Sequence, residues 1–140
     1  MHLFLALVPT AAAAACKEPP SWTIQNLNIT TRDEVGSTGT AAFAFTYNLT
    51  NATEPVACPL HSNYRCTVSG TRADASTVID LQIGLGTVYL SVVQTVDCDG
   101  EGGGTTFVGN AELGVECTTV QFDTHVCLGK TATLQGAENV

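Results

Sequence analysis

The sequence predicts an all-β protein, a single-domain disulfide-bonded β-sandwich or β-barrel of about seven or more short antiparallel strands. Three observations lead to this fold class. Segments of alternating apolar and polar residues recur along the chain, whereas helix-period patterns are almost absent. Glycine, proline and asparagine turn signals separate these segments. Six cysteines accompany them, which indicates a cross-linked domain.

The N-terminal segment MHLFLALVPTAAAAA has the features of a secretory signal peptide. Its apolar core is followed by Pro9 and a run of alanines that offers a small-residue cleavage site. We expect residues 1–15 to be removed, with cleavage between Ala11 and Cys16, which leaves one domain over residues 16–140. No later segment has the roughly 18 consecutive apolar residues of a membrane span. The mature product is therefore expected to be secreted, extracellular and soluble.

The charge balance argues against two classes of partner. Thirteen Asp and Glu residues and five Lys and Arg residues give a net charge of −8. Nucleic acids and anionic membranes are bound through basic surfaces. We therefore expect no nucleic-acid partner and no membrane partner.

The even number of cysteines in a secretory context predicts three disulfide bonds. Six cysteines allow fifteen pairings, and the sequence alone does not choose among them rigorously. The pairings that we favour are Cys58 with Cys66, Cys117 with Cys127, and Cys16 with Cys98. In the chain-entropy model the two short loops contribute about 2.6 to 2.8 kcal/mol each and the long loop about 4.6 kcal/mol.

Other interpretations of the cysteines stay open. A bacterial lipoprotein would carry a lipid on Cys16, but five cysteines would then remain and three Asn-x-Thr triplets would have no purpose. A zinc site is disfavoured because the chain contains no C-x-x-C pair. Cys16 could also bridge two chains, so a monomer and a homodimer are both compatible with the sequence. We expect no metal and no cofactor.

The first predicted strand, residues 22–30, changes phase within its length. Its apolar residues fall in one phase before position 25 and in the other phase after position 26: Trp22, Ile24, Leu27 and Ile29. This change predicts a β-bulge near Gln25 and Asn26. The single tryptophan is expected in the core, although surface tryptophans can also stack on sugars.

The second predicted strand, residues 41–49, has one heavy face. Its odd positions carry the large side chains that should face the core: Phe43, Phe45, Tyr47 and Leu49. The same register places Asn48 outward, and Asn51 falls in the following turn. Asn28 is expected to point outward from the first strand. These three asparagines begin Asn-x-Thr triplets and are the predicted N-glycosylation sites.

The remaining predicted strands are residues 64–69, 77–83, 88–98, 105–117 and 120–128. In the segment 88–98, the apolar row of even positions is broken only by Gln94. In the segment 105–117, the odd positions are expected to face inward. Cys98 and Cys117 fall on these inward rows. Residues 84–86 (GLG) predict a hairpin connection, and residues 99–104 (DGEGGG) predict a loop.

Candidate catalytic groups are few. The mature chain has two histidines, His61 and His125, but no G-x-S-x-G elbow around a nucleophile. Glycoside hydrolysis needs two carboxylates across a cleft, and two acidic clusters occur: Asp97, Asp99 and Glu101, and Glu112 and Glu116. The second cluster is also what a solvated strand face looks like. The segment DCDGE lacks the later glutamate of a calcium loop. We therefore expect no catalytic residue.

The cysteine-bearing segments form a pattern together. An early cysteine is followed by SWTIQNLNIT, a strand of alternating phenylalanines, VAC with NYRC, LSVVQTVDC and TTFVGNAELGVEC. From Cys16 to about Cys127 this order resembles small secreted fungal proteins of the Alternaria major-allergen-like family. Val96 stands here where the family often has tryptophan after Gln-Thr.

The resemblance implies a disulfide-bonded β-barrel or sandwich exported by a fungus, often plant-associated, and acting as an effector, elicitor or allergen-like ligand binder. The leading hypothesis is therefore a secreted, non-enzymatic protein that binds a host extracellular protein or a small ligand. One alternative is a small secreted hydrolase acting on extracellular glycans. Another is a cell-wall carbohydrate-binding protein, for which Trp22 is the only indication in the sequence.

Overall fold

The protein is an all-β molecule, as the sequence predicts. The computed structural model describes residues 17–32, 39–60, 64–72, 75–84, 86–97, 104–121 and 124–139. Ten strands occur in these residues: β1 (Ser21–Arg32), β2 (Thr40–Tyr47), β3 (Ala52–Pro59), β4 (Arg65–Arg72), β5 (Ala75–Ile83), β6 (Thr87–Val96), β7 (Thr105–Gln121), β8 (Thr124–Gly129), β9 (Ala132–Gln135) and β10 (Ala137–Glu138). This part of the chain has no helix that is long and apolar enough to cross a membrane. The predicted leader, residues 1–15, lies outside the described residues.

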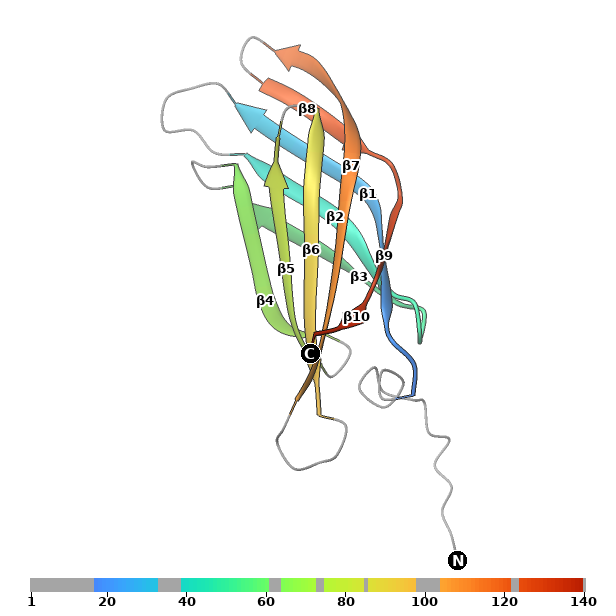
Figure 1. The fold of residues 1–140 in the computed structure, drawn as a ribbon. Coiled ribbons are helices and arrows are strands. Elements are labelled where there is room, and N and C mark those ends of the chain that lie inside the picture. The colour runs from blue at the N-terminus through green and yellow to red at the C-terminus, as the bar shows by residue number, and fades with distance from the viewer. Residues whose placement is uncertain are drawn as a thin grey trace, which may run out of the picture.

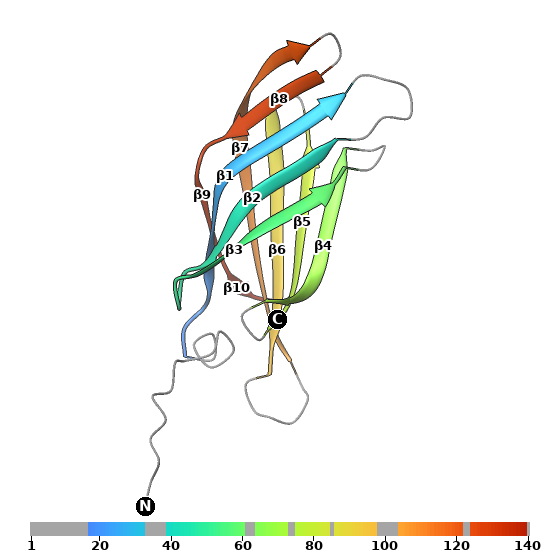
Figure 2. The same cartoon turned by 180° about the vertical axis from the view of Figure 1, so that it is seen from behind.

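The strands form one antiparallel sheet that curls into a nearly closed barrel (Figure 1). Their order is β3-β2-β1-β8-β7-β6-β5-β4. Strands β4 to β7 make the wall nearest the viewer in Figure 1, and β1, β2, β3 and β8 make the wall seen from behind in Figure 2. The two ends of the sheet, β3 and β4, meet at a seam that the disulfide bond Cys58–Cys66 bridges.

The C-terminal segment fills the strip between β1 and β7. β8 pairs with residues 28–32 of β1, β9 pairs with residues 21–24 of β1, and β10 pairs with the first part of β7. Sequence patterns did not predict β9 and β10. They are four and two residues long, and among them only Leu134 is buried. A period of two cannot be recognised over so few residues.

The predicted bulge in β1 is confirmed. The pairing of β1 with β2 shifts between Gln25 and Asn28, and Asn26 has a positive φ of 57°. The extra residue lets the apolar side chains on both sides of the bulge face the same core. All four are fully buried: Trp22, Ile24, Leu27 and Ile29.

Trp22 is a core residue, as expected. Its ring packs against two glycines, Gly109 on β7 and Gly136 after β9. A Cβ atom at these positions would lie 2.7 Å and 2.9 Å from ring atoms of Trp22. The close approach of backbone and ring therefore requires glycine at both places.

The rows predicted for β2 and β6 are confirmed with small changes. Phe43, Phe45 and Tyr47 are buried, whereas Leu49 lies beyond the end of β2 and is half-buried against the core. On β6 the apolar row includes Gln94, which is fully buried. Its Nε2 donates to Thr77 Oγ1 at 3.2 Å, so part of this polar group is satisfied inside the barrel.

Strand β3 is absent from the sequence-based prediction. It contains Pro55 and Pro59, which lack a backbone donor and weaken a strand signal. An edge strand tolerates proline because one side of it has no partner strand. β3 occupies one end of the sheet order, so its composition fits its place.

The boundaries predicted for the two strands at 105–117 and 120–128 are wrong. β7 continues to Gln121, and residues 118 to 120 are the β-branched Thr, Thr and Val that favour extended structure. Cys117, expected on an inward row, is exposed. Residues 116–120 are exposed on both faces because the β7–β8 hairpin reaches beyond the core (Figure 1).

The hairpin predicted at residues 84–86 connects β5 and β6. Gly84 N donates to Thr87 O at 2.8 Å, and Gly86 has a positive φ of 71°. Ile83 and Val88 are paired across this connection. The predicted loop at 99–104 lies outside the described residues except for Gly104.

Candidate functional site

The outer surface of the front wall carries one group of hydrogen-bonding side chains around an aromatic ring. Side chains alternate between the two sides of a strand, so one set of β5, β6 and β7 residues points away from the core. Six of them line a shallow hollow of about 390 Å³ and are called the Tyr89 face: Asp80, Gln82, Tyr89, Ser91, Asn110 and Glu112.

The register of the sheet places these side chains in two rows. Tyr89 on β6 lies directly between Gln82 on β5 and Glu112 on β7. In the next row, Ser91 lies between Asp80 and Asn110. Directly opposed side chains in an antiparallel sheet are close neighbours. The residues come from three different strands, so the face exists only after the sheet has formed.

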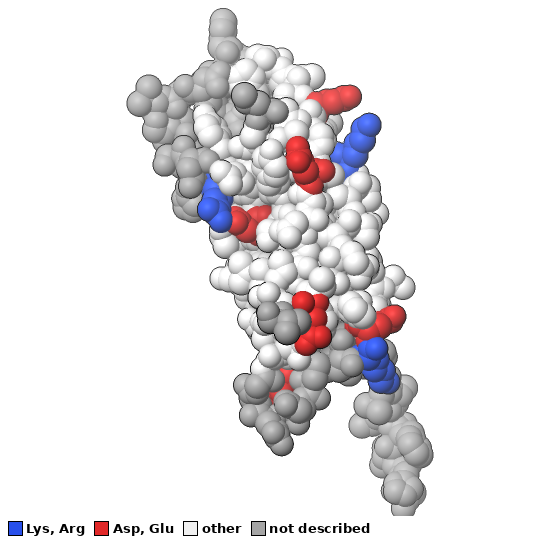
Figure 3. Space-filling view, viewed as in Figure 1, with Lys and Arg blue, Asp and Glu red and all other residues white. Residues whose placement is uncertain are grey.

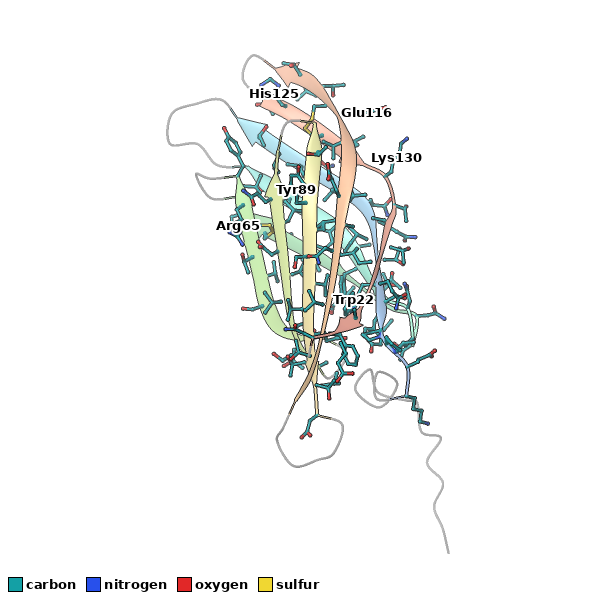
Figure 4. The ribbon with its side chains drawn as sticks, in the orientation of Figure 1. Trp22, Arg65, Tyr89, Glu116, His125 and Lys130 are labelled. Atoms are coloured by element: carbon teal, nitrogen blue, oxygen red, sulfur yellow. A yellow bond between two sulfur atoms is a disulfide. The ribbon has the colours of Figure 1, made fainter. Side chains whose placement is uncertain are left out.

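Tyr89 is the exposed aromatic of this face. Its side chain is 49% exposed, and Figure 4 shows it on the upper part of the front wall, near the start of β6. A Cβ atom at Gly84 would lie 3.3 Å from Cε2 of the ring, so the missing side chain leaves room for the ring there. An exposed, open ring can stack on a ligand.

An ion pair borders the Tyr89 face on the β4 side. Arg65 Nε donates to Asp80 Oδ1 at 2.9 Å, and a second guanidinium nitrogen donates to Oδ2. Thr67 Oγ1 donates to Oδ1 at 3.2 Å. These bonds, that from Arg65 above all, hold the pKa of Asp80 below its usual value, so the carboxylate stays ionised at neutral pH. Asp80 points outward from β5, between the buried Ile79 and Leu81.

The surface around this face is weakly charged. In the view of Figure 3 most of the described surface is uncharged, with separate acidic and basic side chains scattered over it. The face itself contains Asp80 and Glu112, and the positive charge of Arg65 is directed at Asp80. It therefore lacks the cluster of cations that binds phosphate or other anions.

The structure does not bring together the candidate catalytic residues that it describes. Glu112 and Glu116 are four residues apart on one strand, about 13 Å along β7, whereas glycosidase carboxylates lie within about 5 to 10 Å. His125 lies on β8, and its Nδ1 is 3.0 Å from Thr119 Oγ1. Asp97 is exposed after the end of β6. The others, His61, Asp99 and Glu101, lie outside the described residues.

Metal binding has no obvious site in the described segments. No three His, Cys, Asp or Glu side chains gather there in a way that could hold an ion. The two acidic residues of the Tyr89 face lie on strands β5 and β7, with β6 between them.

Two of the favoured disulfide pairings are present. Cys58 bonds to Cys66 across the seam, and Cys117 bonds to Cys127 between β7 and β8. These bonds are consistent with an oxidising, extracellular environment. Cys16 and Cys98, the third favoured pair, lie outside the described residues.

The three predicted glycosylation sites differ in their surroundings. Asn28 is exposed on β1, and Asn51 is exposed in the turn before β3 with a φ of 58°. Asn48, expected to point outward, is half-buried against Ser21 and Thr23, which alternate along β1 with the inward Trp22 and Ile24. Its Nδ2 donates to Ser21 Oγ at 3.0 Å, and its Oδ1 accepts from Thr23 Oγ1 at 2.9 Å. β2 ends at Tyr47, so Asn48 lies directly after the strand.

The sequence matches no protein-family model and no curated protein. The resemblance to the Alternaria major-allergen-like family therefore remains a prediction. Sequence reasoning also did not identify Tyr89 as a site residue. The signal available was its position in the outward phase of the strand at 88–98, with Ser91 two residues later.

Proposed function

We propose that this protein is a secreted binding protein without catalytic activity, which recognises a host extracellular protein or a small ligand on the Tyr89 face. The observation that carries the proposal is an exposed aromatic ring surrounded by polar side chains. Within the described residues, no hydrogen bond to protein engages the side chains of Gln82, Asn110 or Glu112. These groups are available for a partner.

The rigidity of the front wall supports this proposal. β5, β6 and β7 are interior strands, each paired on both sides, and their inward side chains belong to the core. A surface fixed before binding loses little conformational entropy when the ligand arrives. A preorganised face is thus suited to recognition.

The chemistry of the face favours binding over hydrolysis. An acid catalyst must hold a proton at neutral pH, but Arg65 keeps Asp80 ionised. Its carboxylate is better suited to accepting hydrogen bonds from a ligand. The disulfides and the predicted leader support action outside the cell.

Immobilised protein and two variants test the proposal in extracellular fluid from a plant host. We expect the wild type to retain a ligand saturably, and Tyr89→Ala to retain it about tenfold less, as for an aromatic hot spot. Tyr64→Ala is the matched control, since Tyr64 is 50% exposed and lies outside the hollow. Circular dichroism of all three proteins verifies the fold.

Two outcomes would contradict the proposal. One is equal retention by the wild type and Tyr89→Ala, which would remove the face as the binding surface. The other is a change in the mass of the eluted ligand after incubation with the wild type alone, which would show catalysis.

A further inference from the structure

We infer that the ligand of the Tyr89 face is a neutral carbohydrate, bound with one sugar ring stacked on Tyr89. The inference rests on the proposed function and specifies its ligand. A pyranose ring has an apolar face of C–H groups and a rim of hydroxyl groups. It therefore needs an aromatic surface with hydrogen-bonding groups on both sides of it, and the Tyr89 face has this arrangement.

The spacing of the face suits hydroxyl groups at the rim of a sugar. Neighbouring strands lie about 4.8 Å apart, and residues on the same side of one strand lie about 6.8 Å apart. Gln82 and Glu112 therefore flank Tyr89 at one strand spacing each. Ser91 and Asn110 provide a second row for the next sugar of a chain.

The types of side chain also match. Sugar hydroxyls donate and accept hydrogen bonds, and so do the amides of Gln82 and Asn110 and the hydroxyl of Ser91. The carboxylates of Glu112 and Asp80 accept only, and hydrogen bonds to charged groups are stronger than neutral ones. Arg65 acts as a positioning residue, because its bonds fix the Asp80 carboxylate at the border of the hollow.

The charge of the face excludes anionic ligands. With Asp80 and Glu112 negative and Arg65 positive, the local balance is one net negative charge. A phosphorylated or sulfated ligand would be repelled and would find no free cation among the described residues of the face. A neutral glycan requires no counter-charge.

A peptide backbone is not suited to this surface. Extended peptides bind by adding a strand to the edge of a sheet, but β5, β6 and β7 are interior strands whose backbone groups pair with neighbours. Only side chains are available on the face. An apolar ligand is also disfavoured, because the hollow is open and its outward side chains other than Tyr89 are polar.

The inference replaces the earlier indication of carbohydrate binding from Trp22. Trp22 is 0% exposed and packs inside the barrel, so it cannot contact a glycan. Tyr89 provides the exposed ring instead.

Calorimetric titration with four neutral oligosaccharides tests the inference: cellohexaose, laminarihexaose, xylohexaose and chitohexaose. We expect saturable binding of at least one. Tyr89→Ala should weaken it at least tenfold, Tyr89→Phe should keep it within about twofold, and Tyr64→Ala should leave it unchanged. The affinity should be the same in low and high salt, since a neutral ligand has no charge to screen.

The outcomes separate this inference from the proposed function. Absence of binding for all four sugars, or binding that Tyr89→Ala does not weaken, overturns the inference. If a partner from plant fluid is still retained in a Tyr89-dependent manner, and the sugars neither bind nor compete, the proposed function stands and the ligand is not a neutral glycan. Sugar affinity that falls steeply with salt would show that charge dominates the binding and would overturn the inference.

Discussion

The two disulfide bonds close loops of similar length but hold different regions of the barrel together. Their cysteines are 8 and 10 residues apart, for which chain entropy gives nearly equal stabilisation, about 2.6 and 2.8 kcal/mol. Cys58–Cys66 joins β3 and β4, the two ends of the sheet. Cys117–Cys127 joins two strands that are already paired at these residues. The place of a bond in the topology, more than its loop length, therefore decides what it holds.

Burial separates the two regions further. Cys58 and Cys66 are 4% and 2% exposed, so both ends of the seam bond belong to the core, whereas the hairpin bond joins the exposed Cys117 to the buried Cys127. Removing the seam bond thus removes core atoms as well as a cross-link. Removing the hairpin bond leaves the backbone pairing of β7 and β8 in place.

The largest effect is expected from replacing both seam cysteines by alanine. Cys58→Ala with Cys66→Ala should lower the free energy of unfolding by about 3 to 5 kcal/mol, from the lost cross-link and the cavities left by the sulfur atoms. Urea denaturation measures this loss. Hydrogen exchange should rise mainly in β3 and β4, which become free sheet ends.

The matched control is the double variant Cys117→Ala with Cys127→Ala. It should lose only about 2 to 3 kcal/mol, with increased exchange confined to the end of the β7–β8 hairpin. An equal loss of stability in the two double variants would mean that loop length alone decides the contribution of each bond.

A smaller, kinetic difference is expected under mild reduction. Cys117 is an exposed residue, so a thiolate can approach its end of the bond, whereas both cysteines of the seam bond are buried in the core. Dithiothreitol under native conditions should therefore reduce Cys117–Cys127 at least about tenfold faster than Cys58–Cys66. Alkylation followed by peptide mass spectrometry reports the order in which the two bonds are reduced. Reduction of Cys58–Cys66 before Cys117–Cys127 would contradict the prediction.

Features that depend on neighbours in the chain could be predicted from the sequence, whereas features that depend on the topology of the sheet could not. Alternation correctly identified the inward row of β2 and the bulge of β1, because both depend on neighbours in the chain. It missed β3, whose two prolines are acceptable only at a sheet edge, and it misplaced Cys117, whose exposure depends on where the core ends. The Tyr89 face arises from the register of three strands, and alternation within one strand does not show which outward residues of the other strands lie beside Tyr89.

The smallest effect is expected at the ion pair that connects β4 to β5. Next to Cys66, Arg65 on the outer side binds Asp80 of β5. The pKa of Asp80 is lowered in the folded state, so this interaction stabilises the fold above the unfolded pKa of about 3.9 and is lost as the pH falls through the lower folded value. Exposed pairs contribute little, and Asp80→Asn should lower the melting temperature at pH 7 by only about 1 to 4 °C.

The pH dependence of that difference is the diagnostic measurement. Thermal melts of the wild type and Asp80→Asn between pH 7 and pH 2 should converge once the pH has fallen through the lowered folded pKa of Asp80, because both side chains are then uncharged. High salt should also reduce the difference at pH 7. A difference that persists at pH 2 would show that the shape of the side chain matters at this position. The contact between Arg65 on β4 and residue 80 on β5 would then depend on side-chain packing and not on charge.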